Sequence, residues 1–338
     1  MFKNDKKKIA PIFITGVWRS GTTLTSRILN NHPDLSITYD TVHFLRFSYN
    51  KYNPIKKRKN VKKLIFDVQK RLLDRYQIKI SSSVIFKNIK GDYKYSKIYD
   101  SIMKNLLLKN TNKIIWGEKT NLAWTKIPDF FKMYPNGRVI HLIRDPRATL
   151  SSWKKFTEAS GNKYLDSILN SYNSMKSAIK YKNIYKDKKY LIVRYEDLVV
   201  KPKITIKQIC NKLEINYDST MLNTKIFKDI RGNKWKSNSI YKKNLDGISS
   251  VAIDRWKKNL KTWEIYLTNN ILGDLLDIFK YKKTKVLVNQ NLINKTFHEI
   301  KKCKFVSDGI LQFSLGTEGF ERYPSNPLIK SNWSKRSL

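Results

Sequence analysis

The sequence of 338 residues contains little cysteine and no long apolar run. Its two cysteines, Cys210 and Cys303, have neither the spacing of a metal site nor the number needed for a disulfide framework, which fits a reducing compartment. No stretch approaches the ~20 apolar residues of a membrane-spanning helix. The apolar run after the N-terminal lysines is too short for a secretory signal. We therefore expect a cytoplasmic protein.

Acidic residues are also scarce: 27 Asp and Glu stand against 68 Lys and Arg, giving a formal net charge of +41. Such a balance is typical of proteins that bind nucleic acid or anionic membrane surfaces. Only 14 of the 68 basic residues are arginine, however, and the lysines are spread through the chain among abundant Asn and Ile. This pattern indicates a compositional bias of surface positions. Since no nucleic-acid-binding motif accompanies the charge, we expect no nucleic-acid partner.

A third absence lies in the segment Gly16 to Thr23, which reads GVWRSGTT. It has the frame of a phosphate-binding loop, but Thr22 occupies the place of the lysine that reaches the β- and γ-phosphates in nucleoside triphosphatases. Residues 9–15 predict a buried strand before the loop, and residues 22–31 predict a helix after it. Backbone N–H groups at such a turn favour an anion. We expect a phosphate site without magnesium; the alternative is a tight turn with chance glycines.

A second candidate anion site follows Val139 to Ile143, an apolar run that predicts another buried strand, parallel to the first. The run leads into a helix in which Pro146 fits the first turn and Asp145 the cap. Arg144 at the strand end and Ser152 two turns into the helix are placed to meet one ligand from two sides. Alternatively, Arg144 pairs with an acid such as Asp145, and Ser152 only packs.

Together, VWRSGTTL and LIRDPRATLSS resemble the two cofactor motifs of sulfotransferases that use 3'-phosphoadenosine 5'-phosphosulfate (PAPS). In that family the first motif binds the 5'-phosphosulfate, and the second binds the 3'-phosphate through an Arg and a Ser eight residues later, which is the spacing of Arg144 and Ser152. The resemblance spans about residues 9–280. It implies cofactor-binding roles for Trp18, Arg19, Ser20, Gly21, Thr22 and Thr23.

The same resemblance implies an α/β fold of the P-loop-like sulfotransferase type, a parallel sheet with helices on both faces and the ligand at the carboxyl ends of the strands. It implies transfer of a sulfuryl group from PAPS to a hydroxyl by in-line displacement, leaving 3'-phosphoadenosine 5'-phosphate (PAP), without a metal. In this mechanism Arg19 stabilises charge that builds on the sulfuryl oxygens.

Three further segments extend the resemblance. WGEKTN, ending at Asn121, is similar to a W-G-x-K-T-P stretch whose lysine lies beside the leaving group, which implies a catalytic role for Lys119. Residues 191–199 predict a third apolar strand and an acidic turn. They resemble the family's V-x-Y-E-D-L segment, which helps to build the cofactor pocket, and so imply a cofactor-binding role for Tyr195. Glu196 and Asp197 in that turn are expected to cap the helix that begins near Pro202. Arg255, before Trp256, is a weaker phosphate candidate.

Sulfuryl transfer to a hydroxyl needs a base within hydrogen-bond reach of the acceptor oxygen. In the tyrosylprotein branch of the family, a glutamate stands 21 residues beyond the loop arginine, and Asp40 stands at that distance from Arg19. The resemblance therefore implies Asp40 as the base, with a shorter arm. His43 is the alternative, because histidine is the base in the cytosolic small-molecule branch. Asp40 could instead cap a helix that begins at Thr41.

We expect residues 1–281 to form a sulfotransferase domain, with a helical acceptor-binding insertion at about 41–110, and residues 282–338 to form an extension that serves as an acceptor lid, a small subdomain or an oligomer contact. Amphipathic periodicity predicts helices over 61–76, 99–108, 165–185, 204–213 and 268–279. Asp40 and the lack of secretory targeting favour a carbohydrate or glycoconjugate acceptor, such as an anionic glycan or glycolipid, over a protein tyrosine or small molecule. The rival classes are a magnesium-dependent P-loop kinase and a salt-sensitive polyanion binder.

Overall fold

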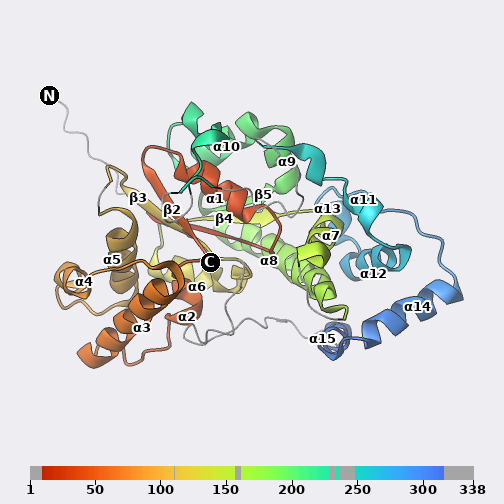
Figure 1. Cartoon of the computed structure of the whole chain (residues 1–338), viewed down its shortest axis with the longest axis horizontal. Helices are drawn as coiled ribbons and strands as arrows, with labels where there is room; N and C mark the ends of the chain where they lie inside the picture. Colours follow the sequence, from red (N-terminus) through yellow and green to blue (C-terminus); the bar gives the residue numbers. More distant parts are fainter. Residues whose placement is uncertain (1–9, 110, 157–160, 229–232, 236–247, 316–338) are drawn as a thin grey trace.

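The computed structural model describes residues 10–109, 111–156, 161–228, 233–235 and 248–315. At its centre lies a parallel sheet of five strands in the order β2-β3-β1-β4-β5 (Figure 1). The strands are β1 (Ile12–Gly16), β2 (Leu35–Tyr39), β3 (Ile115–Lys119), β4 (Arg138–Ile143) and β5 (Tyr190–Arg194). This arrangement confirms the expected α/β class and places the first strand in the middle of the sheet.

Alternate residues of the central strand face two helical layers. Ile12 and Ile14 pack in a cluster with α1 (Thr22–Asn30) and α10 (Pro202–Leu213), whereas Phe13 packs with α6 (Ile127–Met133) and α8 (Asp166–Lys189). Successive side chains of a strand point to opposite faces, so a continuous apolar run is what a doubly covered strand requires. Helices cover both faces, as expected.

The three strands expected from apolar runs are present, with shifted bounds. The predicted strand at 9–15 is β1, and the strand at 139–143 is β4, which pairs in parallel with β1 through Ile14 and Ile140. The apolar run from Leu191 lies in β5. Two further strands were not predicted. Polar Ser36 and Thr38 interrupt the apolar character of β2, and β3 consists of IWGEK itself.

The chain between β2 and β3 forms a helical insertion with a hydrophobic cluster of its own. Leu64, Ile85 and Ile98 belong to this cluster, and Trp116 of β3 joins it to the sheet. Its helices are α2 (Phe44–Phe47), α3 (Arg58–Tyr76), α4 (Ser82–Ile89) and α5 (Tyr95–Leu107). The helices predicted over 61–76 and 99–108 correspond to α3 and α5, while α4 was not predicted.

Five more helices lie between Pro146 and Ile278 in the described part of the chain. They are α7 (Pro146–Phe156), α9 (Tyr195–Val200), α11 (Trp256–Asn259), α12 (Thr262–Leu272) and α13 (Leu275–Ile278). The single helix predicted over 268–279 is interrupted at Gly273, whose φ of +48° lies in the left-handed region. Short 3-10 turns lie at Trp124–Lys126, Lys163–Leu165, Ser219–Leu222, Thr224–Ile226 and Ser250–Ala252.

The acidic turn after β5 differs from the expectation. Glu196 and Asp197 lie inside the short helix α9 and do not cap α10. Glu196 instead accepts hydrogen bonds from the backbone N–H of Asp145 at 3.0 Å and from the Tyr281 hydroxyl at 2.9 Å. The prediction was wrong because a helical turn already begins at Tyr195, so the carboxylate points back to the end of β4.

Two helices follow residue 282, where the apolar residues alternate only weakly. They are α14 (Gln290–Lys301) and α15 (Lys304–Ser314). Ile300 and Val306 join a hydrophobic cluster that also contains Leu169 of α8 and Trp263 of α12. The extension therefore packs, through residue 315, against the second half of the domain. No helix within the described ranges is both long and apolar enough to cross a bilayer.

Candidate active site

The loop after β1 is built for close approach by an anion. Gly21 is the N-cap of α1, with φ +95° and no side-chain cap bond, so the first N–H groups of the helix are left for a ligand. A Cβ at Gly21 would lie 2.4 Å from Cδ2 of Tyr195, and one at Gly16 would lie 2.6 Å from the carbonyl oxygen of Leu142. Both glycines are thus required by their surroundings.

Four residues with a left-handed backbone conformation follow the carboxyl ends of three neighbouring strands. Arg19 (φ +69°), Asp40 (+48°), His43 (+51°) and Leu122 (+52°) follow β1, β2 and β3 within a few residues. A non-glycine residue in this region typically costs about 1–3 kcal/mol, and such residues cluster at functional sites. The strained residues therefore indicate that the candidate site lies at the carboxyl edge of the sheet.

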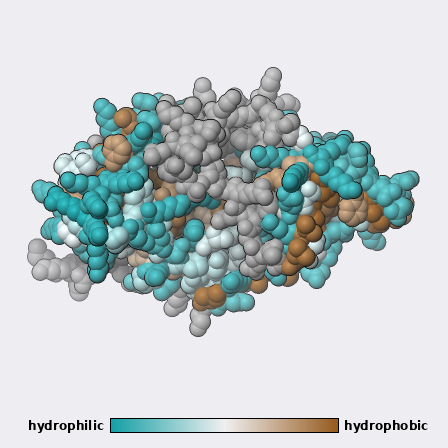
Figure 2. Space-filling view, turned by 90° about the horizontal axis from the view of Figure 1, so that it is seen from below, coloured by the Kyte–Doolittle hydropathy of each residue, from teal (hydrophilic) through white to brown (hydrophobic). Residues whose placement is uncertain are grey.

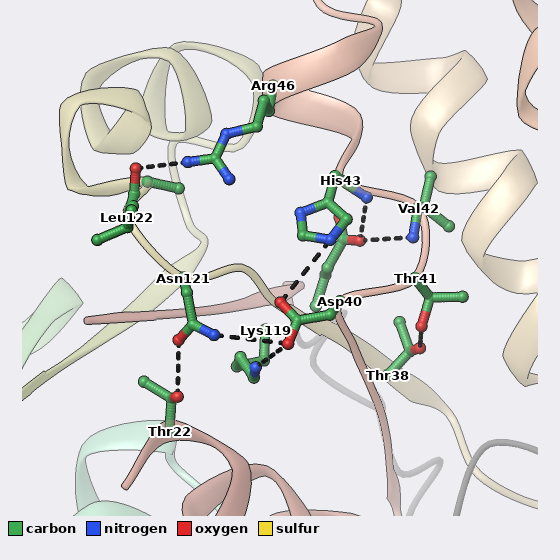
Figure 3. A network of polar contacts seen from close by, with 12 residues as sticks. Thr22, Thr38, Asp40, Thr41, Val42, His43, Arg46, Lys119, Asn121 and Leu122 are labelled. Atoms are coloured by element: carbon green, nitrogen blue, oxygen red, sulfur yellow. Dashed lines mark hydrogen bonds and ion pairs between the residues drawn. The ribbon is translucent and has the colours of Figure 1, made fainter. Parts of the chain in front are cut away.

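Three polar side chains connect this edge to the loop (Figure 3). The Lys119 ammonium donates to Oδ2 of Asp40, and the Asn121 amide approaches the same oxygen at 3.5 Å. Thr22 in turn donates to Oδ1 of Asn121 at 2.8 Å. Asn121, which stands where the resembling motif has proline, thus bridges the candidate base and the phosphate loop.

Lys119 is the one lysine that is buried among those whose side chains the structure describes. Its side chain has no exposed surface, whereas Asp40 beside it retains 29% exposure. Burial lowers the pKa of Lys119, and the ion pair with Asp40 opposes that shift. The WGEKT segment thus led to a lysine that is withdrawn from solvent.

The two candidate bases lie together. Nε2 of His43 is 3.7 Å from Oδ1 of Asp40, and the imidazole is buried. Burial lowers the pKa of His43 well below its ordinary value, and the charges of Arg71, Arg46, Lys119 and Arg75 lower it further. Burial and these charges thus favour the neutral form of the imidazole. Asp40 is the more exposed of the two and does not cap a helix, because α2 begins only at Phe44, with His43 as its N-cap.

Glu118 belongs to the candidate site, although the sequence motifs did not single it out. Its buried carboxylate accepts the backbone N–H groups of Val42 at 3.1 Å, His43 at 2.6 Å and Phe44 at 3.4 Å, and also the Tyr99 hydroxyl. Burial raises the pKa of Glu118, while these hydrogen bonds oppose the shift. Its position between Trp116 and Lys119 in the conspicuous WGEKT segment was the available signal.

Three buried arginines surround His43. Arg46 of α2 donates to the Leu122 carbonyl at 2.6 Å, and Arg71 of α3 donates to the Thr41 carbonyl at 3.0 Å. Arg75 lies one turn after Arg71 and is also buried. Exposed positions of the same helix carry lysines. These three arginines therefore face inward, where a planar guanidinium can stay charged among hydrogen-bond acceptors.

On the other side of the loop, Arg144 follows β4. Its guanidinium donates to the Arg19 carbonyl at 2.7 Å and to the Ala252 carbonyl at 2.9 Å, and it lies 4.2 Å over the Tyr195 ring. Its Nε is buried and has no hydrogen-bond partner among the described residues. Arg19 donates through Nε to the Ser152 hydroxyl at 3.0 Å. The structure thus brings Arg19, Arg144 and Ser152 together.

The alternative pairing of Arg144 with Asp145 is not observed. Asp145 pairs with Arg147 at 2.8 Å rather than with Arg144. Asp145 also accepts the backbone N–H of Arg147 at 2.9 Å, as expected for a residue that caps the helix beginning at Pro146. Arg147 is buried and lies 4.2 Å over the Trp256 ring, a structural role that keeps the start of α7 in place.

The remaining predicted residues lie around the same loop. Trp18 stacks on Trp153 of α7, with ring centroids 4.9 Å apart. The Ser20 hydroxyl donates to the Val17 carbonyl at 2.7 Å and so stabilises the loop itself. Thr23 lies in the first turn of α1. Arg255 immediately precedes α11 and is half-buried.

Comparisons with known proteins identify the family and similar folds. Residues 11–219 match the sequence model of the sulfotransferase family. A predicted protein-tyrosine sulfotransferase of Caenorhabditis briggsae is 25% identical over 217 residues, which cover 62% of this chain and 68% of the relative. The sulfotransferase domain of the Synechococcus PCC 7002 olefin synthase superposes with a TM-score of 0.57 and 20% identity, covering 83% of this chain and 98% of that domain. The sulfotransferase domain from the curacin biosynthetic pathway gives a TM-score of 0.52 and 17% identity, over 81% and 99%.

Proposed function

The chain belongs to the sulfotransferase family, and we propose that it transfers a sulfuryl group from PAPS to a hydroxyl of an anionic carbohydrate or glycoconjugate. The observation that carries the proposal is a polar network through the loop. On one side Thr22 connects through Asn121 to Asp40 and Lys119, and on the other Arg19 contacts Ser152. A candidate base and candidate phosphate ligands thus converge on one loop.

The residues present fit PAPS. The uncapped start of α1, with Thr22 and Thr23, would hold the 5' end, where helix N–H groups favour an anion. Arg144 and Ser152 would hold the 3'-phosphate, and the buried Nε of Arg144 offers a donor without a partner in the described part of the chain. When bound, PAPS supplies the sulfuryl group and leaves PAP.

The chain's own residues divide the remaining work. Asp40, partly exposed, accepts the proton of the acceptor hydroxyl, and the neutral His43 lies behind it. Lys119 and Arg19 place positive charge where negative charge develops, and removal of one such donor typically costs about 3 kcal/mol of transition-state stabilisation. Because Lys119 is fully buried, its charge acts where water does not screen it.

The arginines around the candidate base support an anionic acceptor. Arg46, Arg71 and Arg75 place three positive charges close to His43, beside the acids Asp40 and Glu118. A carboxylate, sulfate or phosphate on the acceptor would interact favourably with this positive charge. A neutral sugar would make no such interaction, so the charge pattern supports an acidic glycan or glycolipid.

Sulfation of a protein tyrosine is the second candidate. The relative from Caenorhabditis briggsae favours it, and acidic residues beside a tyrosine would interact with the same positive charge. The carboxylate arm separates the two candidates, because this chain has Asp40 where the tyrosylprotein branch has glutamate. Turnover of an acidic oligosaccharide over a tyrosine peptide with acidic neighbours is the expected result, and the reverse preference would establish the second candidate.

The cofactor is tested by calorimetric titration with PAP, with ADP–magnesium in parallel. Tight binding of PAP without metal is expected, and Arg144→Ala should abolish it. Arg138→Ala is the matched control, since Arg138 begins the same strand and pairs at its far end with Glu214 at 3.0 Å. Equal or stronger binding of ADP–magnesium would overturn the proposal in favour of a kinase. Binding that depends only on salt would indicate a polyanion binder.

The acceptor class is tested with an oligosaccharide in neutral and carboxylated forms, with release of PAP as the readout. Arg71→Gln and Arg75→Gln should raise KM for the carboxylated form and leave KM for the neutral form unchanged. Arg58→Gln, at the exposed start of the same helix, is the control. Equal turnover of both forms by the unmodified enzyme would show that the enzyme does not recognise the negative charge of the oligosaccharide.

A further inference from the structure

The two C-terminal helices leave apolar side chains uncovered. One face of α14 and α15 packs on the domain through Ile300 and Val306. On other faces, Phe297 is 59% exposed, Leu311 60% and Leu315 70%. Figure 2 shows hydrophobic surface on the side of the molecule where these helices lie in Figure 1. This exposed set, with Leu287 and Val288, is called the C-terminal apolar face below.

On each helix the exposed apolar side chain has an apolar neighbour one turn away. The half-buried Ile293 lies four residues before Phe297 on α14, and Leu311 of α15 lies four residues before Leu315, the C-cap of that helix. Residues four apart lie on one side of a helix. In the segment before α14, Leu287 is 87% exposed and Val288 52% exposed. Exposed apolar side chains that gather on neighbouring elements are typical of an interaction site.

Lysines flank the same face. Between residues 282 and 304 the exposed ones are Lys282, Lys283, Lys285, Lys295, Lys301, Lys302 and Lys304. Glu299 is buried and pairs with Lys295 at 2.9 Å and with Lys302 at 3.0 Å, so it presents little negative charge to a partner. The surface therefore combines exposed leucine and phenylalanine with a surplus of positive charge.

We propose that the C-terminal apolar face docks on an anionic phospholipid bilayer. Helices that carry Phe and Leu on one side and Lys around them lie in the plane of a membrane surface, with the apolar side chains at the acyl boundary and the ammonium groups among the headgroups. The inference goes beyond the proposed reaction and does not depend on which hydroxyl is sulfated.

Charge decides between this occupant and a second copy of the chain. Each copy carries a formal net charge of +41, and each would bring the same lysines to the contact. Like charges that face each other across an interface disfavour association, whereas an anionic surface attracts them. The same lysines thus oppose self-association through this face and favour a negatively charged lipid surface.

Flotation of the full chain with vesicles tests the proposal. Pure phosphatidylcholine vesicles are compared with vesicles that also contain phosphatidylglycerol, and strong binding is expected only to the latter. Phe297→Ser and Leu311→Ser should each weaken binding about tenfold or more, because each removes a large apolar side chain that becomes buried when the protein binds the bilayer. Lys301→Ser and Lys304→Ser should each weaken it about fivefold.

Phe66→Ser is the matched control, because Phe66 on α3 is 60% exposed, as Phe297 is, but lies outside the C-terminal apolar face. It should leave vesicle binding unchanged. Binding of PAP by every variant reports that the domain is folded. Equal binding to both vesicle types, or equal loss with Phe66→Ser, would overturn the proposal. A dimer in sedimentation that Phe297→Ser converts to a monomer would instead assign the face to a second copy.

Discussion

The carboxylate of Glu118 accepts the backbone N–H of His43 at 2.6 Å. This bond, with those from Val42 and Phe44, fixes the loop that carries both candidate bases to the strand that carries Lys119. The acid and the lysine are neighbours in the chain, so on a strand their side chains point to opposite faces. One secures the loop, and the other pairs with Asp40.

We expect Glu118→Gln to lower kcat at least about tenfold and the free energy of unfolding by about 1–3 kcal/mol, since a buried set of N–H donors loses its charged acceptor. Affinity for PAP should be unchanged, because the bonds lie on the acceptor side of the loop. The measurements are steady-state kinetics, denaturant unfolding and PAP titration. Glu214→Gln, at an exposed surface pair, is the control; an unchanged kcat in Glu118→Gln would contradict this positioning role.

Asp40→Asn should lower kcat about 100-fold or more, since a general base typically contributes that factor, while PAP still binds. Asp40→Glu should retain part of the activity, because it keeps the carboxylate. The pKa of His43 is lowered well below its ordinary value, so its protonation should leave no limb near pH 6.5 in the profile of kcat. A limb there that disappears in His43→Asn would assign the base to His43 instead.

Gly21→Ala should abolish PAP binding. Its φ of +95° disfavours a side chain, and the added Cβ would meet Tyr195 at 2.4 Å, so the loop must move. Gly91→Ala separates the two effects, because Gly91 has a similar φ of +80° with nothing within 4 Å of the added Cβ. It should cost about 1 kcal/mol of stability and leave PAP binding intact. Normal PAP binding by Gly21→Ala would show that the close approach is not needed.

Asp166 predicts a pH dependence of stability. Burial raises the pKa of Asp166 to about 7, and the hydrogen bond from Trp153 at 3.0 Å only partly opposes this. A carboxyl whose pKa is raised on folding contributes stability that is fully present below its unfolded pKa of about 3.9 and is lost as the pH rises through the folded value. Between these values, the unfolding free energy should fall relative to that of Asp166→Asn by up to about 1.4 kcal/mol per pH unit. Parallel curves for the two proteins would refute the shift.

The positions of the loop, Arg144 and Ser152 at strand ends and helix starts could be predicted because they depend on short stretches of sequence. Glycine spacing and the step from strand to helix are local properties, and the structure places Arg19, Arg144 and Ser152 in one group. The parallel sheet was predicted for the same reason, since apolar runs mark β1, β4 and β5. Strands β2 and β3 were missed because Ser36 and Thr38 in β2, and the segment GEK in β3, interrupt the apolar pattern.

The contributions of Glu118, Arg71 and Asn121 could not be predicted, because each depends on a partner far away in the chain. Arg71 reaches the Thr41 carbonyl across 30 positions, and Asn121 meets Thr22 across 99. On a helix rich in lysine, residue type alone does not show that Arg71 and Arg75 are buried. Their burial results from the packing of the insertion against the edge of the sheet.

The insertion occupies a single connection, between β2 and β3, and has its own hydrophobic cluster, whereas the candidate phosphate ligands lie on the connections after β1 and β4. Under the proposed function, the donor and the acceptor would be recognised by separate segments of the chain. A change in the length or sequence of the insertion would then alter the acceptor and leave the donor site unchanged. The same separation makes the insertion the segment to exchange when a new acceptor preference is engineered.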